Sequence, residues 1–272
     1  MRIGFIGLGS QGGPMARRII EAGYRTTLWA RRPETLAAFA DTGATVAESP
    51  AELAAASDLV CVCVVGDADV VEVADGVAGV LAGLASGGVL AIHSTVHPDT
   101  CRELAKKAAA QGISVVDAPV SGGGQAAAER RLLVMAGGET EVVERCRPVF
   151  DTYAGHVVHL GDLGAGQVAK LLNNLLFTAN LATAATTFDL GRGLGVDPTR
   201  LGEVIAHGSG NSVALSTIAP LGGSLQQLAI YAAELLRKDV GLVTDLAVRA
   251  EAPNGVVLTT AETTLALMDK LR

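Results

Sequence analysis

Short hydrophobic runs alternate with alanine-rich amphipathic stretches over about the first 160 residues of the chain. The runs predict strands and the stretches between them predict helices. One run, 58–65, is apolar at nearly every position, which is typical of a strand buried on both faces of a parallel sheet. The sequence therefore predicts an α/β domain with a doubly wound parallel sheet. We expect its strands near 2–6, 25–29, 58–65, 88–92, 113–117, 132–136 and 156–160.

The pattern changes after the glycine-rich segment 161–166 to long Leu/Ala stretches with helical spacing. The first of these predicts a helix from about 165 to 191 that stops at Gly191 or Gly193, because glycine commonly follows a helix end. We therefore expect two domains, an α/β domain over 1–162 and an all-helical domain over 163–272, joined by this long interdomain helix.

The polar side chains of that long helix exclude a membrane span. Its most apolar stretch still carries a lysine and three asparagines, each costly to place in lipid, at Lys170, Asn173, Asn174 and Asn180. The first strand starts at Arg2 and leaves no room for a targeting segment, so we expect a cytoplasmic protein.

Charge and composition limit the partners. The chain has 272 residues and a net charge of −7, which disfavours nucleic acid or an anionic membrane surface as a partner. The four cysteines show no C-x-x-C spacing and are expected to be reduced thiols, mostly in the core. The five histidines form no cluster with carboxylates, so we predict no metal site.

A glycine-rich turn directly follows the first predicted strand and opens a helix. It reads Gly7-Leu8-Gly9-Ser10-Gln11-Gly12, the G-x-G-x-x-G pattern of dinucleotide-binding Rossmann domains. Gly7 permits the tight turn, Gly9 lets the backbone approach a pyrophosphate, and Gly12 allows close packing of helix on strand. The amides of the helix N-terminus then face the phosphates.

The residues after the second strand indicate which dinucleotide binds. An NAD enzyme places Asp or Glu there against the ribose 2′-hydroxyl, but this chain has Arg31 and Arg32. Two guanidinium groups can pair a 2′-phosphate, which favours NADP and leaves NAD as the alternative cofactor. The alternative is that one or both arginines are solvated charges at a helix start. Glu34 lies in the following helix and is a poor substitute for the missing acid.

Two further segments carry candidate substrate chemistry. The first reads Asp117-Ala118-Pro119-Val120-Ser121-Gly122-Gly123, where a hydroxyl and successive glycine amides can form a concave nest for a carboxylate. The second, 164–174, holds Lys170 four residues before Asn174, so both side chains share one helix face. A lysine among apolar neighbours is suited to acid/base work, although a solvated surface lysine is the alternative.

These two segments resemble the D-A-P-V-S-G-G and G-x-G-x-x-x-K-x-x-N-N signatures of the β-hydroxyacid dehydrogenase family. The resemblance implies that Ser121, Gly122 and Gly123 bind the substrate carboxylate and that Lys170 and Asn174 are catalytic. Ser94-Thr95-Val96-His97-Pro98 is similar to the family's S-T-x-x-P turn, which implies that Ser94 and Thr95 lie near the nicotinamide or its ribose. Lys238-Asp239-Val240-Gly241-Leu242 resembles its K-D-x-G-L stretch, which implies that Lys238 reaches the substrate.

The chain also departs from the family pattern. Arg130 and Arg131 replace a small Gly-Thr step, so the loop backbone must differ or the arginines must point outward. The region between Asn211 and Leu228 looks shorter than usual and lacks an aromatic-bearing segment that helps close the pocket. Both departures bear on the identity of the substrate.

The resemblance implies a hydride transfer between nicotinamide and a small hydroxy acid or oxo acid. Lys170 would serve as general acid/base and Asn174 would orient the lysine and the reacting oxygen. The alternatives are an imine reductase on the same scaffold, which generally replaces the lysine, and a non-catalytic NADP-binding interaction protein. A 6-phosphogluconate dehydrogenase needs a larger helical domain. The long helix also predicts a homodimer or higher homo-oligomer, because its Leu/Ala faces need covering.

Overall fold

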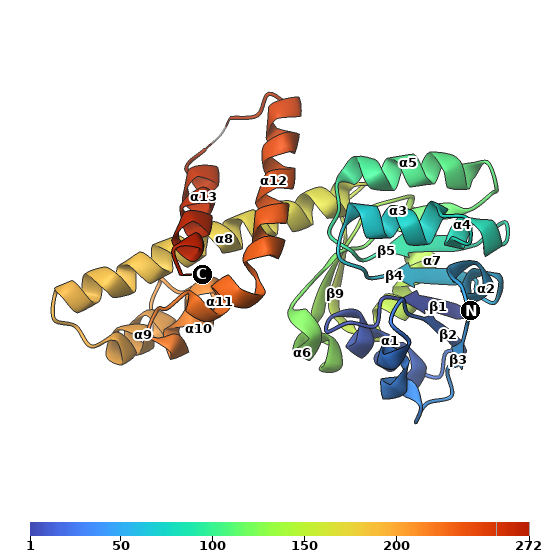
Figure 1. Cartoon of the computed structure of the whole chain (residues 1–272). Coiled ribbons are helices and arrows are strands. Elements are labelled where there is room, and N and C mark those ends of the chain that lie inside the picture. Colours follow the sequence, from blue (N-terminus) through green and yellow to red (C-terminus); the bar gives the residue numbers. More distant parts are fainter. Residues whose placement is uncertain (254, 272) are drawn as a thin grey trace. The chain divides into compact units, whose positions relative to one another are not determined.

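The N-terminal part of the chain forms a six-stranded parallel sheet in the computed structural model, which describes residues 1–253 and 255–271 (Figure 1). The strand order is β3-β2-β1-β4-β5-β6, so the order reverses between β1 and β4. The predicted α/β class with a doubly wound sheet is confirmed. The strands are β1 (Ile3–Ile6), β2 (Thr26–Trp29), β3 (Thr45–Val46), β4 (Leu59–Val62), β5 (Val89–Ile92) and β6 (Ser114–Asp117).

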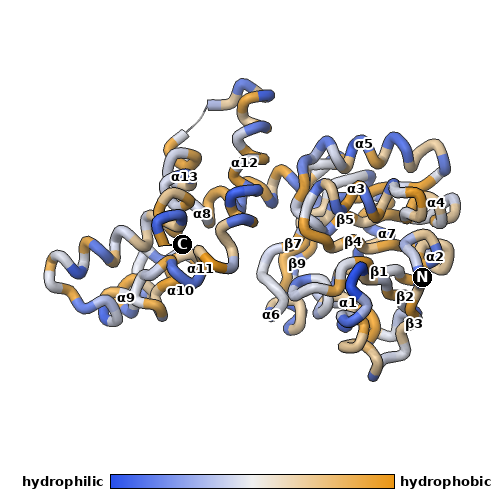
Figure 2. Tube along the Cα trace, viewed as in Figure 1, coloured by the Kyte–Doolittle hydropathy of each residue, from blue (hydrophilic) through white to orange (hydrophobic). Residues whose placement is uncertain are grey.

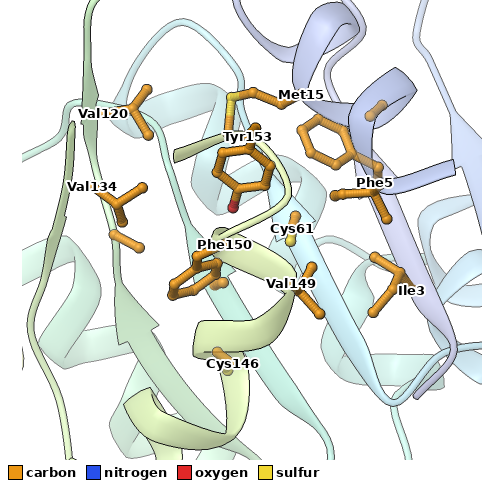
Figure 3. Close-up of a cluster of buried hydrophobic side chains, with 14 of the residues drawn as sticks. Ile3, Phe5, Met15, Cys61, Val120, Val134, Cys146, Val149, Phe150 and Tyr153 are labelled. Atoms are coloured by element: carbon orange, nitrogen blue, oxygen red, sulfur yellow. The ribbon is translucent and has the colours of Figure 1, made fainter. Parts of the chain in front are cut away.

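Alternate residues of the buried strands supply two separate cores, one on each face of the sheet. Phe5 and Cys61 face one core together with Tyr153 (Figure 3), whereas Ile6 and Val60 face the other. Figure 2 shows the hydrophobic colour of β4 against the mixed colouring of α5. The helices are α1 (Gly12–Glu21), η1 (Pro33–Phe39), α2 (Pro50–Ala55), α3 (Asp67–Asp75), α4 (Val80–Gly83), α5 (Pro98–Ala109), α6 (Gly123–Ala128) and α7 (Thr140–Phe150).

A second, three-stranded sheet replaces the expected continuation of the parallel sheet. Its strands β7 (Val120–Ser121), β8 (Leu132–Ala136) and β9 (Ala154–His159) lie in that order, with β7 antiparallel and β9 parallel to β8. The expectation that β8 and β9 extend the first sheet is therefore wrong. Pro119 has no N–H to donate to a ladder, and the chain turns between Asp117 and Val120.

The C-terminal part of the chain is helical. The apolar stripe of α8 packs with residues of the later helices in one core that includes Leu175, Phe188, Leu236, Leu258 and Met268. The predicted long helix is confirmed and ends at Gly193. The helices are α8 (Ala165–Gly193), α9 (Pro198–His207), α10 (Val213–Ile218), η2 (Ala219–Leu221), α11 (Gln226–Tyr231), α12 (Ala233–Arg249) and α13 (Val256–Asp269).

By its internal contacts the chain divides into two units, and the division falls after Lys170. The boundary thus lies inside α8, whereas the sequence pattern places it before that helix, at 162. Within residues 1–253 and 255–271, every helix is too short or too polar to span a bilayer.

A buried histidine in the N-terminal unit makes its stability depend on pH. The Nδ1–H of His93 donates to the carbonyl oxygen of Ala118 (2.6 Å), which can only accept, so Nε2 accepts from the Tyr153 hydroxyl (3.2 Å). Burial lowers the pKa of His93 from 6.5 to about 4. The unfolded chain therefore binds a proton that the folded chain does not between these two values.

We expect the contribution of His93 to the free energy of unfolding to be complete above pH 6.5. It should fall by up to about 3 kcal/mol as the pH drops from 6.5 through 4. Urea denaturation of the wild type and of His93→Gln at several pH values measures this. The variant should be less stable at pH 7 and should have a shallower pH slope, whereas His156→Gln on the exposed strand β9 controls for losing any histidine. An unchanged slope in His93→Gln would contradict the assignment.

Candidate active site

Two of the three glycines in the turn after β1 make close contacts that a side chain would block. Gly7 has a φ of +97°, a conformation that L side chains rarely adopt, and a Cβ there would meet the carbonyl oxygen of Cys63 after β4. A Cβ on Gly12 would meet the carbonyl oxygen of Gly7. A Cβ on Gly9, in contrast, would meet nothing within 4 Å. The backbone of Gly9 is therefore open to a ligand, and the turn fits a dinucleotide pyrophosphate.

The other residues of the turn are placed as follows. Leu8 is buried and Ser10 is exposed, while the Gln11 side chain lies along α1 with Nε2 3.5 Å from the Met15 sulfur. The α1 N-terminus begins directly behind the turn, so the positive end of the helix dipole lies beside it. Gly13 donates to the Gly9 carbonyl oxygen (2.8 Å) and closes the turn.

The two arginines after β2 differ in their contacts. The Arg31 guanidinium is paired with two acids of α3, at 2.7 Å from Asp69 and 3.0 Å from Glu72. The Arg32 side chain is exposed, and its backbone carbonyl accepts a hydrogen bond from the Thr35 hydroxyl. Arg31 is therefore held by protein carboxylates at the place where a 2′-phosphate is expected, which the sequence did not indicate.

The turn after β5 is tied to the start of α8 by Gln167. The Gln167 amide donates to the carbonyl oxygen of Ser94 (2.8 Å) and accepts from the backbone N–H of Val96 (3.1 Å). The Ser94 hydroxyl accepts from the backbone N–H of Val64 (2.8 Å), which joins the same turn to the end of β4. Thr95 lies between these anchors and is partly exposed. Gln167 itself is fully buried.

Asp117 at the end of β6 caps the first turn of α8. Its carboxylate accepts from the backbone N–H groups of Gly164 (2.6 Å) and Gln167 (2.7 Å), two donors that the helix leaves unpaired. Burial raises the pKa of Asp117, and the hydrogen bonds from Gly164 and Gln167 partly oppose that rise. The two residues that Asp117 caps lie 47 and 50 positions later in the sequence, so the local pattern could not reveal this role.

The glycines of the 164–174 segment let α8 approach the sheets closely. A Cβ on Gly166 would meet the carbonyl oxygen of Met135 in β8 and the Asp117 carboxylate. Lys170 follows one turn after Gln167 and is buried. The helix start that carries Lys170 is thus fixed to the ends of β5, β6 and β8.

The expected carboxylate clamp lies beside the glycine turn. Ser121 ends β7, and Gly122 and Gly123 follow with φ values of +131° and +75°, which L side chains rarely adopt. A Cβ on Gly124 would meet the carbonyl oxygen of Ser10, which shows how closely this segment approaches the turn.

The backbone at Arg130 has a conformation that favours glycine. Arg130 has a φ of +56°, in the left-handed region, and Arg131 is exposed and paired with Glu129. The sequence left open whether the loop backbone differs or the arginines point outward. Arg131 points outward.

In the C-terminal unit, Asp239 joins the two remaining candidates. The Asn174 amide donates to one carboxylate oxygen of Asp239 (2.6 Å), and the Lys238 ammonium lies 3.0 Å from the other. Asp239 is buried and Lys238 is partly exposed. Asp239 fixes the amide of Asn174, a role that sequence reasoning missed although the residue stands in the K-D-x-G-L stretch. Tyr231, at the end of α11, is an exposed aromatic side chain just past the short 211–228 region.

Three of the four cysteine side chains are buried, and that of Cys63 is partly buried. The four cysteines are free thiols; burial raises the pKa of Cys63 and of Cys146 to about 12 and raises that of Cys61 and Cys101. In the part of the chain that the structure describes, no group of three His, Cys, Asp or Glu side chains could hold a metal ion.

Comparisons with known proteins cover nearly the whole chain. Residues 2–161 match the model of the NAD binding domain of 6-phosphogluconate dehydrogenase, and residues 164–271 match the NAD-binding region of NADP-dependent 3-hydroxyisobutyrate dehydrogenase. The 3-hydroxyisobutyrate dehydrogenase of Pseudomonas aeruginosa is 35% identical over 264 residues, 94% of this chain and 89% of that protein. The chain belongs to the β-hydroxyacid dehydrogenase family. It is therefore an NAD(P)-dependent oxidoreductase.

Solved structures place this β-hydroxyacid dehydrogenase with the same group. The Mycobacterium tuberculosis 3-hydroxyisobutyrate dehydrogenase, solved with L-serine, is 28% identical, covers both chains completely and has a TM-score of 0.85. A Streptomyces aurantiacus imine reductase covers 100% of this chain and 99% of its own with a TM-score of 0.65, but at 18% identity it shares the fold alone.

Proposed function

We propose that this β-hydroxyacid dehydrogenase interconverts a small hydroxy acid and its oxo acid or semialdehyde, with Lys170 as general acid/base. The observation that carries the proposal is the fixed position of Lys170. The lysine is buried one helical turn beyond Gln167, and Gln167 and Asp117 hold that helix start against the Ser94–Val96 turn. Relatives that are named dehydrogenases of hydroxy acids support the substrate class.

The proposed roles follow from the donors and acceptors that each side chain offers. The Lys170 amine takes the hydroxyl proton during oxidation and returns a proton to the carbonyl oxygen during reduction. Asn174, held by Asp239, orients the reacting oxygen, and Ser121, Gly122 and Gly123 hold the carboxylate. Lys238 is a further residue proposed to bind the substrate. Bound nicotinamide supplies or accepts the hydride.

NADP is the proposed preferred cofactor. Gly7, Leu8, Gly9, Ser10, Gln11 and Gly12 would hold the pyrophosphate, and Ser94 and Thr95 would lie near the nicotinamide ribose. Arg31 and Arg32 would pair the 2′-phosphate, because no carboxylate of β2 or its following turn is there to accept from a ribose hydroxyl. The family model of NADP-dependent enzymes that matches residues 164–271 supports this choice.

A substrate and cofactor panel tests the proposal. Purified protein should turn over at least one of 3-hydroxyisobutyrate, glycerate, threonate or their semialdehydes, and should bind NADPH more tightly than NADH in fluorescence titrations. Equal NADH binding that is unchanged in an Arg31→Ala/Arg32→Ala variant would remove the NADP assignment. Binding of NADPH without turnover of any hydroxy acid, semialdehyde or imine would favour a non-catalytic scaffold.

Two further expectations from the sequence stay predictions. We propose at least a homodimer, since α8 exposes Leu172, Leu176 and Leu190 along its length. We also propose a cytoplasmic location, because the family's reactions use small polar substrates.

A further inference from the structure

The ion pairs of Arg31 cross the place where the strand order reverses. Arg31 follows β2, and Asp69 and Glu72 belong to α3, which follows β4. Strand β1 lies between β2 and β4, and its carboxyl end carries the glycine turn. The two ion pairs therefore span the crevice above Gly7. In open parallel sheets this crevice is where a dinucleotide binds.

These ion pairs are weak enough for a ligand to displace. The Arg31 and Glu72 side chains are 56% and 68% exposed, and that of Asp69 is 27% exposed. Ion pairs that water reaches in this way change an equilibrium by at most about fivefold each. A phosphate accepts two parallel, charge-assisted hydrogen bonds from one guanidinium, which is a stronger contact than either single-oxygen pair made here.

The same acids also cancel the positive charge of the crevice. Arg31 and Arg32 supply two positive charges, and Asp69 and Glu72 supply two negative ones, so the four side chains together are formally neutral. A 2′-phosphate brings further negative charge to this position, whereas a ribose 2′-hydroxyl brings none. Neutralising the acids should therefore affect NADP and NAD differently.

We propose that Asp69 and Glu72 are specificity-determining residues, which hold Arg31 across the cofactor crevice and compete with a 2′-phosphate for its guanidinium. The proposal rests on the cofactor site described under the proposed function. Cofactor choice then depends on α3 as well as on the residues at the end of β2. The competition lowers the affinity for NADP(H) below the value that two arginines alone would give, and leaves the affinity for NAD(H) nearly untouched.

Binding of adenosine phosphates tests this without any catalytic step. The probes are 2′,5′-ADP, which carries the 2′-phosphate, and 5′-ADP, which lacks it, titrated by calorimetry alongside NADPH and NADH. Asp69→Asn/Glu72→Gln should bind 2′,5′-ADP and NADPH about three- to tenfold more tightly than the wild type, with less than twofold change for 5′-ADP and NADH. The gain should shrink at about 0.5 M salt, because Glu72 is exposed and Asp69 is partly exposed.

Asp75→Asn is the matched control, because it removes one charge from the far end of the same helix, where Asp75 is paired with Lys107. It should leave all four affinities unchanged. Arg31→Ala in both backgrounds completes a double-mutant cycle, and the gain should be clearly smaller where Arg31 is absent. An equal gain for every probe, no gain, or a loss of NADH affinity would each overturn the proposal; the last outcome would make the acids ribose ligands. The wild type could prefer NADH while the double variant still binds 2′,5′-ADP more tightly. That result would contradict only the NADP preference and not the role of the two acids.

Discussion

Lys170→Ala should turn over the best substrate roughly two to four powers of ten more slowly than the wild type. The reason is that the variant has no group at the helix position that Asp117 and Gln167 fix, and water is a poorly placed substitute. The affinity for NADPH should stay nearly the same, because the glycine turn and the arginines are unchanged. Steady-state kinetics and fluorescence titration separate the two effects.

Lys170→Arg makes the test sharper. It keeps the positive charge but cannot lose its proton at ordinary pH, so it should be nearly as inactive as the alanine variant. Lys106→Ala, on the exposed side of α5, controls for removal of a positive charge from the N-terminal unit. If Lys170→Ala retained more than about a tenth of wild-type turnover, with a substrate deuterium isotope effect showing that chemistry limits the rate, the lysine would be structural.

The elements that a local pattern can encode were predictable from the sequence. The continuous apolar run that contains β4, the glycine turn after β1 and the length of α8 were all visible as periodicity or motif. Strands β3 and β7 were not, because each has two residues and no alternation can be read from two positions. The separate sheet of β7, β8 and β9 depends on the chain's path around Pro119, which hydrophobicity does not record.

The contacts that position the candidate site could not be predicted from the sequence, for a different reason. Gln167 meets Ser94 across 73 residues, and Arg31 meets Asp69 across 38. Each residue is ordinary in its own segment, and only the order of strands in the sheet brings the partners together. The residues predicted from motifs are the ones proposed to contact ligands, and the structure adds the residues that hold them in place.

Asp117→Ala should cost about 2–4 kcal/mol of stability, the second large effect that the structure predicts. The wild-type carboxylate is buried and accepts from two backbone N–H groups in the first turn of α8, at 2.6 Å from Gly164 and 2.7 Å from Gln167. Its loss leaves both donors without this partner and removes a negative charge from the positive end of the helix. Asp117→Asn keeps one acceptor oxygen and should lose about half as much.

Hydrogen exchange measured by mass spectrometry locates the effect. In Asp117→Ala the amides of 163–171 should exchange about 10- to 100-fold faster than in the wild type, because the helix start opens locally. Turnover should also fall, since Lys170 lies in the segment that loosens. Asp99→Asn is the control: Asp99 too stands in the first turn of a helix, α5, but it is only partly buried and is paired with the exposed Arg102, so its loss should cost no more than about 0.5 kcal/mol. If exchange at 163–171 matched the wild type while global stability fell, Asp117 would act through the core and not through the helix that carries Lys170.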